Sequence, residues 1–177
     1  LYAGSGGAVR QKREMATVLG EDPDNIRVLS MDVGGNFGTR NRVYVEFALV
    51  LWAARELARP VKWIGERSDG FLTDYQGRGR GAERAELALD GEGNFLALRI
   101  DLIADLGAHP SPRGAIPATL NTASLSNVYR TPAILVRSRG VLTNTVPTEV
   151  YRGAGRPENL HLLERLVDVA AHDLGLD

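Results

Sequence analysis

Apolar and polar residues recur along this chain with two different periods, and these periods predict its elements. Apolar positions three or four residues apart predict helices at residues 8–19, 42–58 and 157–174. Shorter apolar runs and alternating segments predict strands. The expected strands are residues 26–31, 61–64, 83–89, 95–105 and 133–142.

The strands at residues 83–89 and 95–105 are predicted to form a β-hairpin, because a turn sequence, D-G-E-G-N, lies between them. In the second arm Leu98 and Ile100 point one way, which is typical of a sheet with one solvated face. The helix at residues 42–58 is apolar on two sides, so we expect it to be deeply buried, with Asn41 as its N-cap. We therefore predict an α+β fold, a mixed sheet with an antiparallel hairpin and packed helices.

Composition restricts the possible partners and chemistry. The formal net charge is −1, which gives no reason to expect nucleic acid or an anionic membrane surface. There is no cysteine, so disulfides, thiolate metal ligands and a cysteine nucleophile are excluded. The three histidines, His109, His161 and His172, do not share metal-ligand spacing, so no metal site of the chain's own side chains is predicted. We expect a cytoplasmic location.

A glycine-rich turn, G-G-N-F-G, occupies residues 34–38, between the predicted strand at residues 26–31 and the long helix. Adjacent N–H groups in such a turn, together with a helix N-terminus, bind anions or polarised oxygens. The spacing matches neither the dinucleotide-binding pattern nor the phosphate-binding P-loop. A tight turn without a ligand is the plain alternative.

A second glycine-rich segment, Y-R-G-A-G-R-P-E, occupies residues 151–158 and leads into the last helix. Its two arginines carry planar forks of donors that suit phosphate or carboxylate groups. The alternative is that Arg152 and Arg156 pair with surface acids.

Taken together, these two segments resemble the G-G-x-F-G and [Y/F]-R-G-x-G-x-P-[E/Q] patterns of the large subunit of molybdenum hydroxylases. This superfamily includes xanthine dehydrogenase, aldehyde oxidase and carbon monoxide dehydrogenase. Residues 66–71 and 105–109 also resemble family segments, E-R-x-E-D-x and D-x-G-A-Y. The similarity runs in order over essentially the whole chain, so we expect residues 1–177 to be a single fragment of the molybdopterin-binding domain, truncated at both ends from a longer subunit.

The resemblance implies an enzyme that hydroxylates an aldehyde or an N-heterocycle with oxygen from water. It implies a molybdopterin cofactor in the cytosine dinucleotide form, with iron–sulfur clusters and FAD on partner domains or subunits. The implied partners are the remainder of the same subunit, iron–sulfur and flavin subunits and a small organic substrate, with no nucleic acid and no membrane.

The resemblance also assigns roles to residues. Arg152 is expected to border the active site, where it orients substrate or stabilises developing charge. The backbone of residues 34–38 is expected to lie against the molybdenum end of the cofactor, with the Phe37-Gly38 backbone donating to an oxygen ligand. The expected cofactor-binding residues are Gly6, Gly34, Gly35, Asn36, Phe37, Gly38, Gly153 and Ala154.

Three positions depart from the patterns of relatives. Gly6 stands where many relatives carry a glutamine that hydrogen-bonds an oxo ligand. Asn41 stands where purine-oxidising relatives carry a glutamate, and Gly153 stands where carbon monoxide dehydrogenases carry a cysteine. These differences argue against purine and carbon monoxide and favour a bulkier organic substrate.

The glutamate that acts as the base in this family has no counterpart in the chain, so we expect the chain alone to be inactive. Two rival hypotheses remain, a non-catalytic anion- or nucleotide-binding module and a degenerate homologue that folds without the cofactor.

Overall fold

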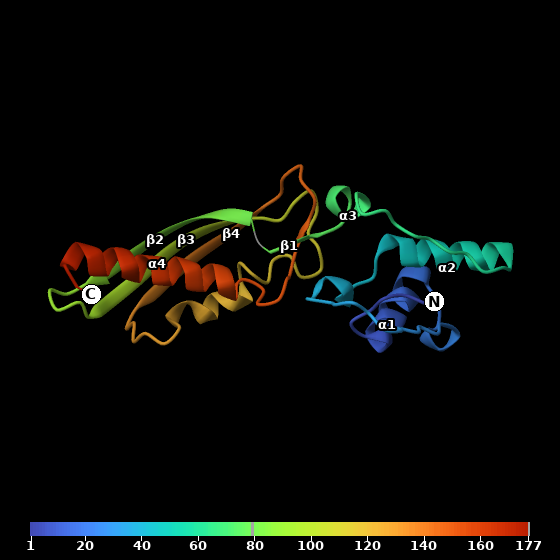
Figure 1. The fold of residues 1–177 in the computed structure, drawn as a ribbon, viewed down its shortest axis with the longest axis horizontal. Coiled ribbons are helices and arrows are strands. Elements are labelled where there is room, and N and C mark those ends of the chain that lie inside the picture. The colour runs from blue at the N-terminus through green and yellow to red at the C-terminus, as the bar shows by residue number, and fades with distance from the viewer. Residues whose placement is uncertain (79, 177) are drawn as a thin grey trace. The chain divides into compact units, whose positions relative to one another are not determined.

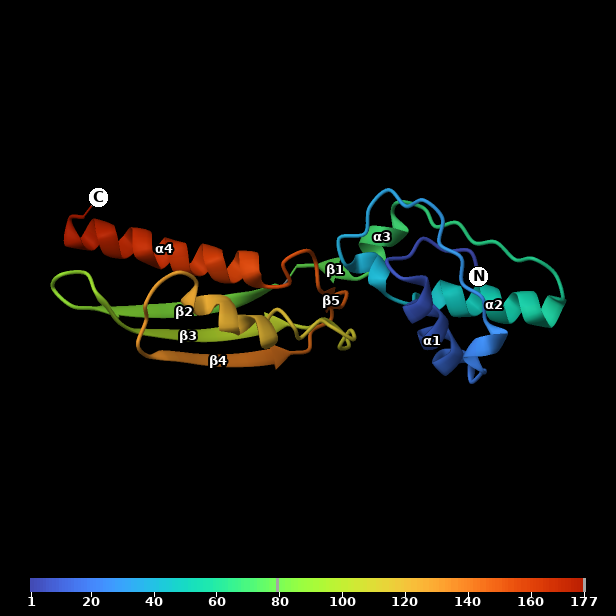
Figure 2. The same ribbon diagram turned by 90° about the horizontal axis from the view of Figure 1, so that it is seen from below.

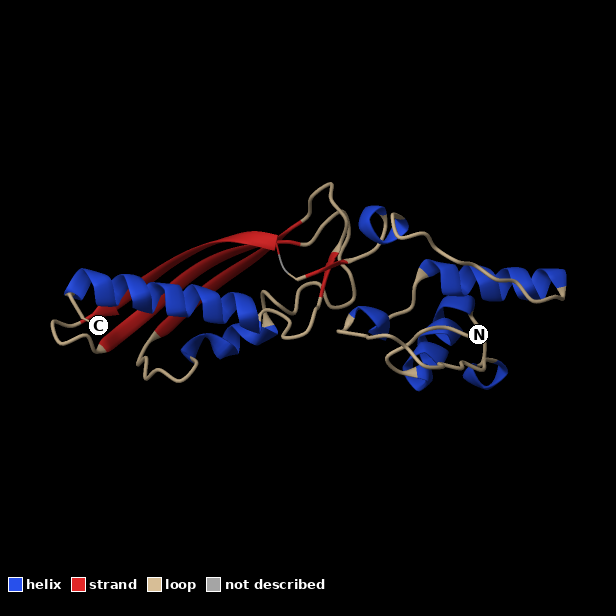
Figure 3. Ribbon diagram, viewed as in Figure 1, coloured by secondary structure: helices blue, strands red, loops and turns tan. Residues whose placement is uncertain are grey.

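The computed structural model describes residues 1–78 and 80–176, which form two compact units, Leu1–Gly70 and Phe71–Asp177. Each unit has a hydrophobic core of its own. Figure 3 shows that the helical segments occur in both units, whereas the strands belong to the second. No helix in the described part of the chain is long and apolar enough to cross a membrane.

The first unit is built from two helices, α1 (Ala8–Leu19) and α2 (Val45–Leu57) (Figure 1). The helix α1 has the bounds expected from its periodicity, and it ends at Gly20, whose φ of 65° is left-handed. Short 3₁₀ helices, η1 (Pro23–Asn25) and η2 (Thr39–Asn41), lie between the two helices in sequence. The core consists of buried Met15, Ala16 and Ile26, with partly buried side chains of α2 packed against them.

The strand expected at residues 26–31 is not formed, and this prediction is wrong. The segment makes a single bridge, in which Leu29 pairs with Tyr2. Apart from Ile26 N–H to the Pro23 carbonyl, its backbone hydrogen bonds go to the first residues of the chain, such as Leu29 N–H to the Leu1 carbonyl at 2.8 Å. A partner this short provides too few bonds for a ladder. The strand expected at residues 61–64 is also absent.

The helix α2 begins three residues later than expected, and Tyr44 with extended backbone is its N-cap. The prediction that Asn41 caps this helix is wrong, because the side-chain oxygen of Asn41 accepts a hydrogen bond from Asn36 Nδ2 instead. The prediction that this helix is deeply buried is also wrong. No residue of α2 is buried, and Val45 and Trp52 are 68% and 51% exposed. Only one of its two apolar sides packs against the core of this unit.

The second unit contains a sheet with the strand order β2 (Arg80–Leu89), β3 (Phe95–Asp105) and β4 (Ile134–Val141). The strands β2 and β3 form the antiparallel hairpin that the turn sequence predicted, and β4 pairs with β3 in parallel. The predicted mixed sheet is therefore confirmed. Two very short strands, β1 (Gln76–Gly77) and β5 (Thr148–Glu149), form a separate parallel pair.

The helix α4 (Arg156–Leu174) and the 3₁₀ segment η3 (Leu120–Ser126) lie side by side along the sheet (Figures 1 and 2). Leu163 of α4 and Leu125 of η3 pack on Leu98 and Ile100 of β3, and all four side chains are at most 2% exposed. Burying each of these side chains contributes on the order of 2 kcal/mol. This packing fixes the start of α4, which directly follows the second glycine-rich segment.

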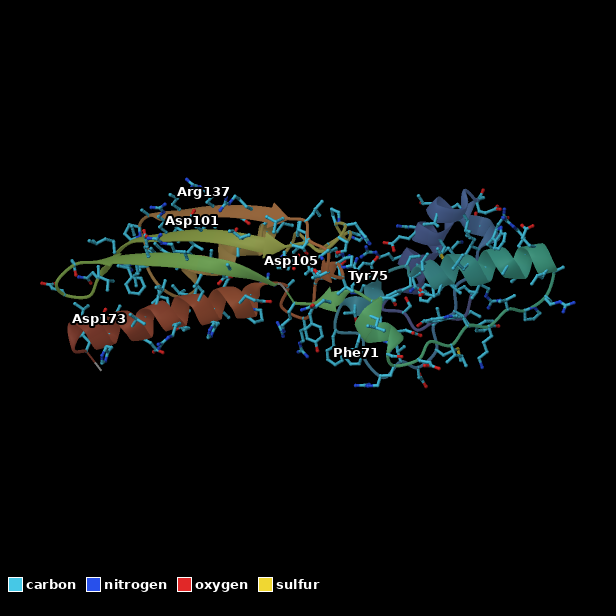
Figure 4. The ribbon with its side chains drawn as sticks, turned by 90° about the horizontal axis from the view of Figure 1, so that it is seen from above. Phe71, Tyr75, Asp101, Asp105, Arg137 and Asp173 are labelled. Carbon is cyan, nitrogen blue, oxygen red and sulfur yellow. The ribbon has the colours of Figure 1, made fainter. Side chains whose placement is uncertain are left out.

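The other face of the sheet is polar, as the alternation in β3 predicted. Figure 4 labels Asp101 on β3 and Arg137 on the neighbouring β4, and an Nη1–Oδ1 distance of 3.6 Å joins them. Arg99 lies 3.3 Å from the same carboxylate. The remaining short helix, α3 (Asp69–Leu72), spans the boundary between the two units in sequence.

Candidate functional site

The first glycine-rich turn, residues 34–38, is called the first arch below. Three of its residues have positive φ, namely Gly35 at 138°, Phe37 at 52° and Gly38 at 103°. Glycine adopts such values without strain, whereas a left-handed phenylalanine costs on the order of 1 kcal/mol. The ring of Phe37 lies over Gly35, where an added Cβ would meet its Cε2 atom at 2.7 Å. The arch is thus a defined, locally strained structure.

The first arch carries backbone donors that its own hydrogen bonds do not use. Among the residues that the structure describes, the N–H groups of Gly34, Gly35 and Asn36 have no acceptor. A Cβ added at Gly34 would meet nothing within 4 Å. Adjacent unsatisfied N–H groups on an open surface bind an oxygen atom or an anion, because they supply several oriented partial positive charges at once. The arch therefore fits an oxygen-bearing group such as the metal end of a molybdopterin.

Gly6 lies directly against this arch. Its N–H donates to the Arg40 carbonyl at 3.1 Å. A Cβ added at Gly6 would lie 1.8 Å from Asn41 Oδ1 and 2.1 Å from Asn36 Nδ2. The structure thus brings together Gly6, Asn36 and Asn41, for which the sequence patterns indicated no contact.

The second glycine-rich turn, residues 151–155, is called the second arch below. Three consecutive residues have positive φ, namely Gly153 at 99°, Ala154 at 49° and Gly155 at 99°. Ala154 N–H donates to the Tyr151 carbonyl at 2.6 Å, which closes the turn before α4 begins. The N–H groups of Arg152 and Gly153 have no acceptor among the described residues.

Two arginines of this segment carry free positive charge. Arg152 and Arg156 are exposed, and neither has a carboxylate partner in the described part of the chain. The alternative that they pair with surface acids is therefore not what the structure shows. An arginine is always charged at neutral pH, so Arg152 presents a donor fork that can take a carbonyl or an anion.

A pocket of about 250 Å³ lies beside the second arch, within the second unit. It is lined by Gly155, Glu158, Glu83 and His161, with apolar walls from β3. Burial raises the pKa of the Glu83 carboxyl, and the nearby Glu158 raises it further, while His161 lowers it. The sequence did not indicate this pocket, because its residues come from segments with no common motif.

Asp105 organises the loop that follows β3. Its carboxylate accepts from Gly107 N–H at 2.7 Å and from the hydroxyls of Thr143 and Thr145 at 2.6 and 3.3 Å. The segment at residues 105–109 was noticed only through its resemblance to a family pattern. Its structural role explains why an acid followed by a glycine stands there, since Gly107 has a φ of 76°.

Comparison with known proteins decides which family these arches belong to. The model of one family, the molybdopterin cofactor-binding domain, matches residues 1–177. The chain belongs to this family. The resemblance that the two glycine-rich segments indicated is thereby confirmed, and a general anion- or nucleotide-binding module is not favoured.

Named relatives agree with this assignment. The gamma subunit of the 6-hydroxypseudooxynicotine dehydrogenase complex of Paenarthrobacter nicotinovorans is 30% identical over 165 residues, covering 93% of this chain and 21% of that protein. The carbon monoxide dehydrogenase large chain of Hydrogenophaga pseudoflava is 33% identical, with coverage of 93% and 21%. This molybdopterin-domain chain thus spans about a fifth of the length of these relatives.

A solved structure shows the same fold. The crystal structure of quinoline 2-oxidoreductase from Pseudomonas putida 86 matches with a TM-score of 0.92 and 32% identity, covering 99% of this chain and 22% of that one. The α+β fold expected for part of a molybdenum-cofactor-binding domain is therefore confirmed. Among the described residues, no group of three or more histidine or acidic side chains could hold a metal ion.

Proposed function

We propose that this chain is part of the molybdopterin-binding subunit of an oxidoreductase that hydroxylates an aldehyde or an N-heterocycle with oxygen from water. The observation that carries the proposal is the first arch, in which the N–H groups of Gly34, Gly35 and Asn36 have no acceptor among the described residues. An oxygen ligand of a bound cofactor is the group that such donors hold best.

The names of relatives support both substrate classes. They include a nicotine 6-hydroxylase large subunit and a quinoline 2-oxidoreductase, which name N-heterocycles, and an aldehyde oxidoreductase. Several of the names describe one subunit or chain of a larger assembly. We extend this to partner subunits with iron–sulfur clusters and FAD, to the cytosine dinucleotide form of the cofactor and to a cytoplasmic location. We also propose that residues 1–177 are one fragment of the domain and that the chain alone is inactive. Of these residues, Gly79 and Asp177 lie outside the part that the structure describes.

The chain's own residues do two things in this proposal. A bound molybdopterin supplies the two-electron redox chemistry. The N–H groups of Gly34, Gly35 and Asn36 hold an oxygen atom in a fixed position, with the backbone of Phe37 and Gly38 completing the arch and Gly6, Gly153 and Ala154 as further backbone contacts. Arg152 orients the substrate or stabilises charge that develops on it, and its guanidinium needs no proton transfer to do so.

Replacing Arg152 in the complete subunit tests this assignment. Arg152→Ala should lower kcat/KM by about a hundredfold, the effect typical of losing one fixed electrostatic donor, while the molybdenum content stays unchanged. Arg165→Ala is the matched control, because Arg165 lies on α4, the helix that follows the second arch, and its ion-pair partner is Asp168, at 3.9 Å on the same helix. Undiminished turnover of Arg152→Ala would refute the catalytic role, and a complete subunit that holds no molybdopterin would refute the function.

A further inference from the structure

We propose that Arg78 is a positioning residue that holds the second arch, and with it Arg152, in one conformation. Its guanidinium contacts the ring of Tyr151, where the arch begins, and the carboxylate of Glu158, in the first turn of the helix that follows the arch. The inference deepens the proposed function and rests on it, because Arg152 is the residue through which Arg78 acts.

The second arch depends on contacts outside it. Gly153 and Gly155 reach many backbone conformations, so this segment gains more freedom when it loosens than an ordinary turn does. A hydrogen bond from Ala154 N–H to the Tyr151 carbonyl closes the turn at 2.6 Å. Arg152 lies inside this turn, and its backbone is therefore fixed only as firmly as the two ends of the arch are held.

Arg78 contacts both ends. Its Cζ atom lies 4.9 Å from the centroid of the Tyr151 ring, and its Nη1 atom lies 4.0 Å from Glu158 Oε2. A planar guanidinium can lie over a ring and present N–H groups sideways to a carboxylate at the same time, whereas a lysine ammonium is a single point charge. Each contact at a partly exposed site shifts an equilibrium a few-fold, so the two together favour the observed arch by about tenfold.

The backbone before Arg78 brings its side chain to the arch. The strand β1 pairs in parallel with β5 (Figure 2), and this pairing places Gly77 opposite the fully buried Glu149. Gly77 lies against Tyr151, where an added Cβ would meet its Cδ2 atom at 3.0 Å. Arg78 itself has a φ of 74°, which a residue with a side chain keeps only where its surroundings impose it. Such strained residues cluster at functional sites.

Arg84 shows what an ordinary surface arginine does in the same unit. Its side chain is 80% exposed, and its partner is Glu86 on the same strand, at 3.0 Å. The side chain of Arg78 is 44% exposed, and its two partners lie in a distant part of the sequence. Contacts of the second kind order an irregular segment, whereas a pair within one strand does not. Arg84 is therefore the matched control for Arg78.

A double-mutant cycle in the complete, cofactor-loaded subunit tests whether Arg78 acts through Arg152. Arg78→Ala should lower kcat/KM about tenfold at unchanged molybdenum content. In an Arg152→Ala background the same change should lower it by less than about twofold, because the residue that Arg78 positions is already absent. Arg78→Lys, which keeps the charge without the planar fork, should fall between wild type and Arg78→Ala. Arg84→Ala should leave kcat/KM unchanged.

Hydrogen exchange on the same variants gives a readout that does not depend on turnover. In Arg78→Ala the N–H group of Ala154 should exchange about tenfold faster, because the same two contacts are lost, while protection of the β2–β3 hairpin matches the wild type. Arg84→Ala should leave both unchanged.

Equal losses of activity in the two Arg152 backgrounds, or unchanged exchange of Ala154 N–H, overturn the proposal while the proposed function stands. Lost protection throughout the second unit overturns it as well, since Arg78 would then support the whole unit and not the arch. Undiminished turnover of Arg152→Ala, or a wild-type subunit without molybdenum, overturns the proposed function and this role of Arg78 together.

Discussion

Gly155 connects the second arch to α4, and its replacement by alanine tests how tightly the arch is built. Its φ of 99° and ψ of −16° lie outside the left-handed region that other residues reach, at φ of about 50–70°. An added Cβ would also meet the Pro117 carbonyl oxygen at 2.6 Å and its Cα at 2.7 Å. Both the conformation and the close approach therefore require glycine.

The expected loss of stability in Gly155→Ala is the sum of these two effects, the backbone strain and the close approach to Pro117. Backbone strain contributes on the order of 1–2 kcal/mol, and displacing the Pro117 backbone adds about as much, which gives about 3 kcal/mol in total. Gly175 at the other end of α4 is the matched control. Its φ of 66° and ψ of 29° lie close to that left-handed region, and an added Cβ meets nothing within 4 Å, so Gly175→Ala should cost only about 1 kcal/mol.

Native-state hydrogen exchange on the complete subunit measures both costs locally, without assuming two-state unfolding. In Gly155→Ala, protection of the first turns of α4 should fall by about a hundredfold, because 1.4 kcal/mol corresponds to a factor of ten. In Gly175→Ala, protection of the last turn should fall by only about fivefold. Equal losses in the two variants would show that the contact between Gly155 and Pro117 does not exist in solution.

Three further substitutions have defined expectations in the complete subunit. Leu163→Ala should lower the free energy of unfolding by about 2–5 kcal/mol, since Leu163 is 1% exposed, whereas Leu160→Ala, at 38% exposure, should cost much less in the same denaturant titration. Burial and a neighbouring carboxylate raise the folded-state pKa of Glu83 above its ordinary 4.5, so its contribution to stability is lost as pH rises through that pKa; Glu83→Gln should match the wild type in thermal stability at pH 4 and exceed it at pH 7.5, and a gap that shrinks with rising pH would contradict this. Asp105→Asn should cost about 1–3 kcal/mol, because one amide oxygen replaces a carboxylate that accepts three donors, and an unchanged denaturation midpoint would refute that role.

Local patterns predicted the elements whose stability is local. The helix α1 and the strand β3 have the bounds expected from the sequence, because a helical apolar stripe and a hairpin turn specify their own geometry. The segment at residues 26–31 alternates like a strand, but a strand needs a partner, and only the first residues of the chain pair with it. Periodicity also could not tell which of the two apolar sides of α2 packs inside this chain.

The same limit applies to the site. Both arches were predicted, because glycine clusters before helices report backbone conformation directly. The Asn36–Asn41 pair was not predicted, since a side-chain contact depends on where the folded chain places Gly6. The signal was nevertheless present, because Gly6 and Asn41 were two of the three departures from the family patterns. When two residues depart from a family pattern and the side chain of one occupies the space left by the other, the two changes belong to one structural feature.

A crystal structure of the complete subunit with its cofactor, with molybdenum located by anomalous scattering, tests the central claim most directly. We expect an oxygen atom of the cofactor within hydrogen-bonding distance of the N–H groups of residues 34–36. A molybdenum centre bound elsewhere, with these N–H groups facing only water, would contradict the account.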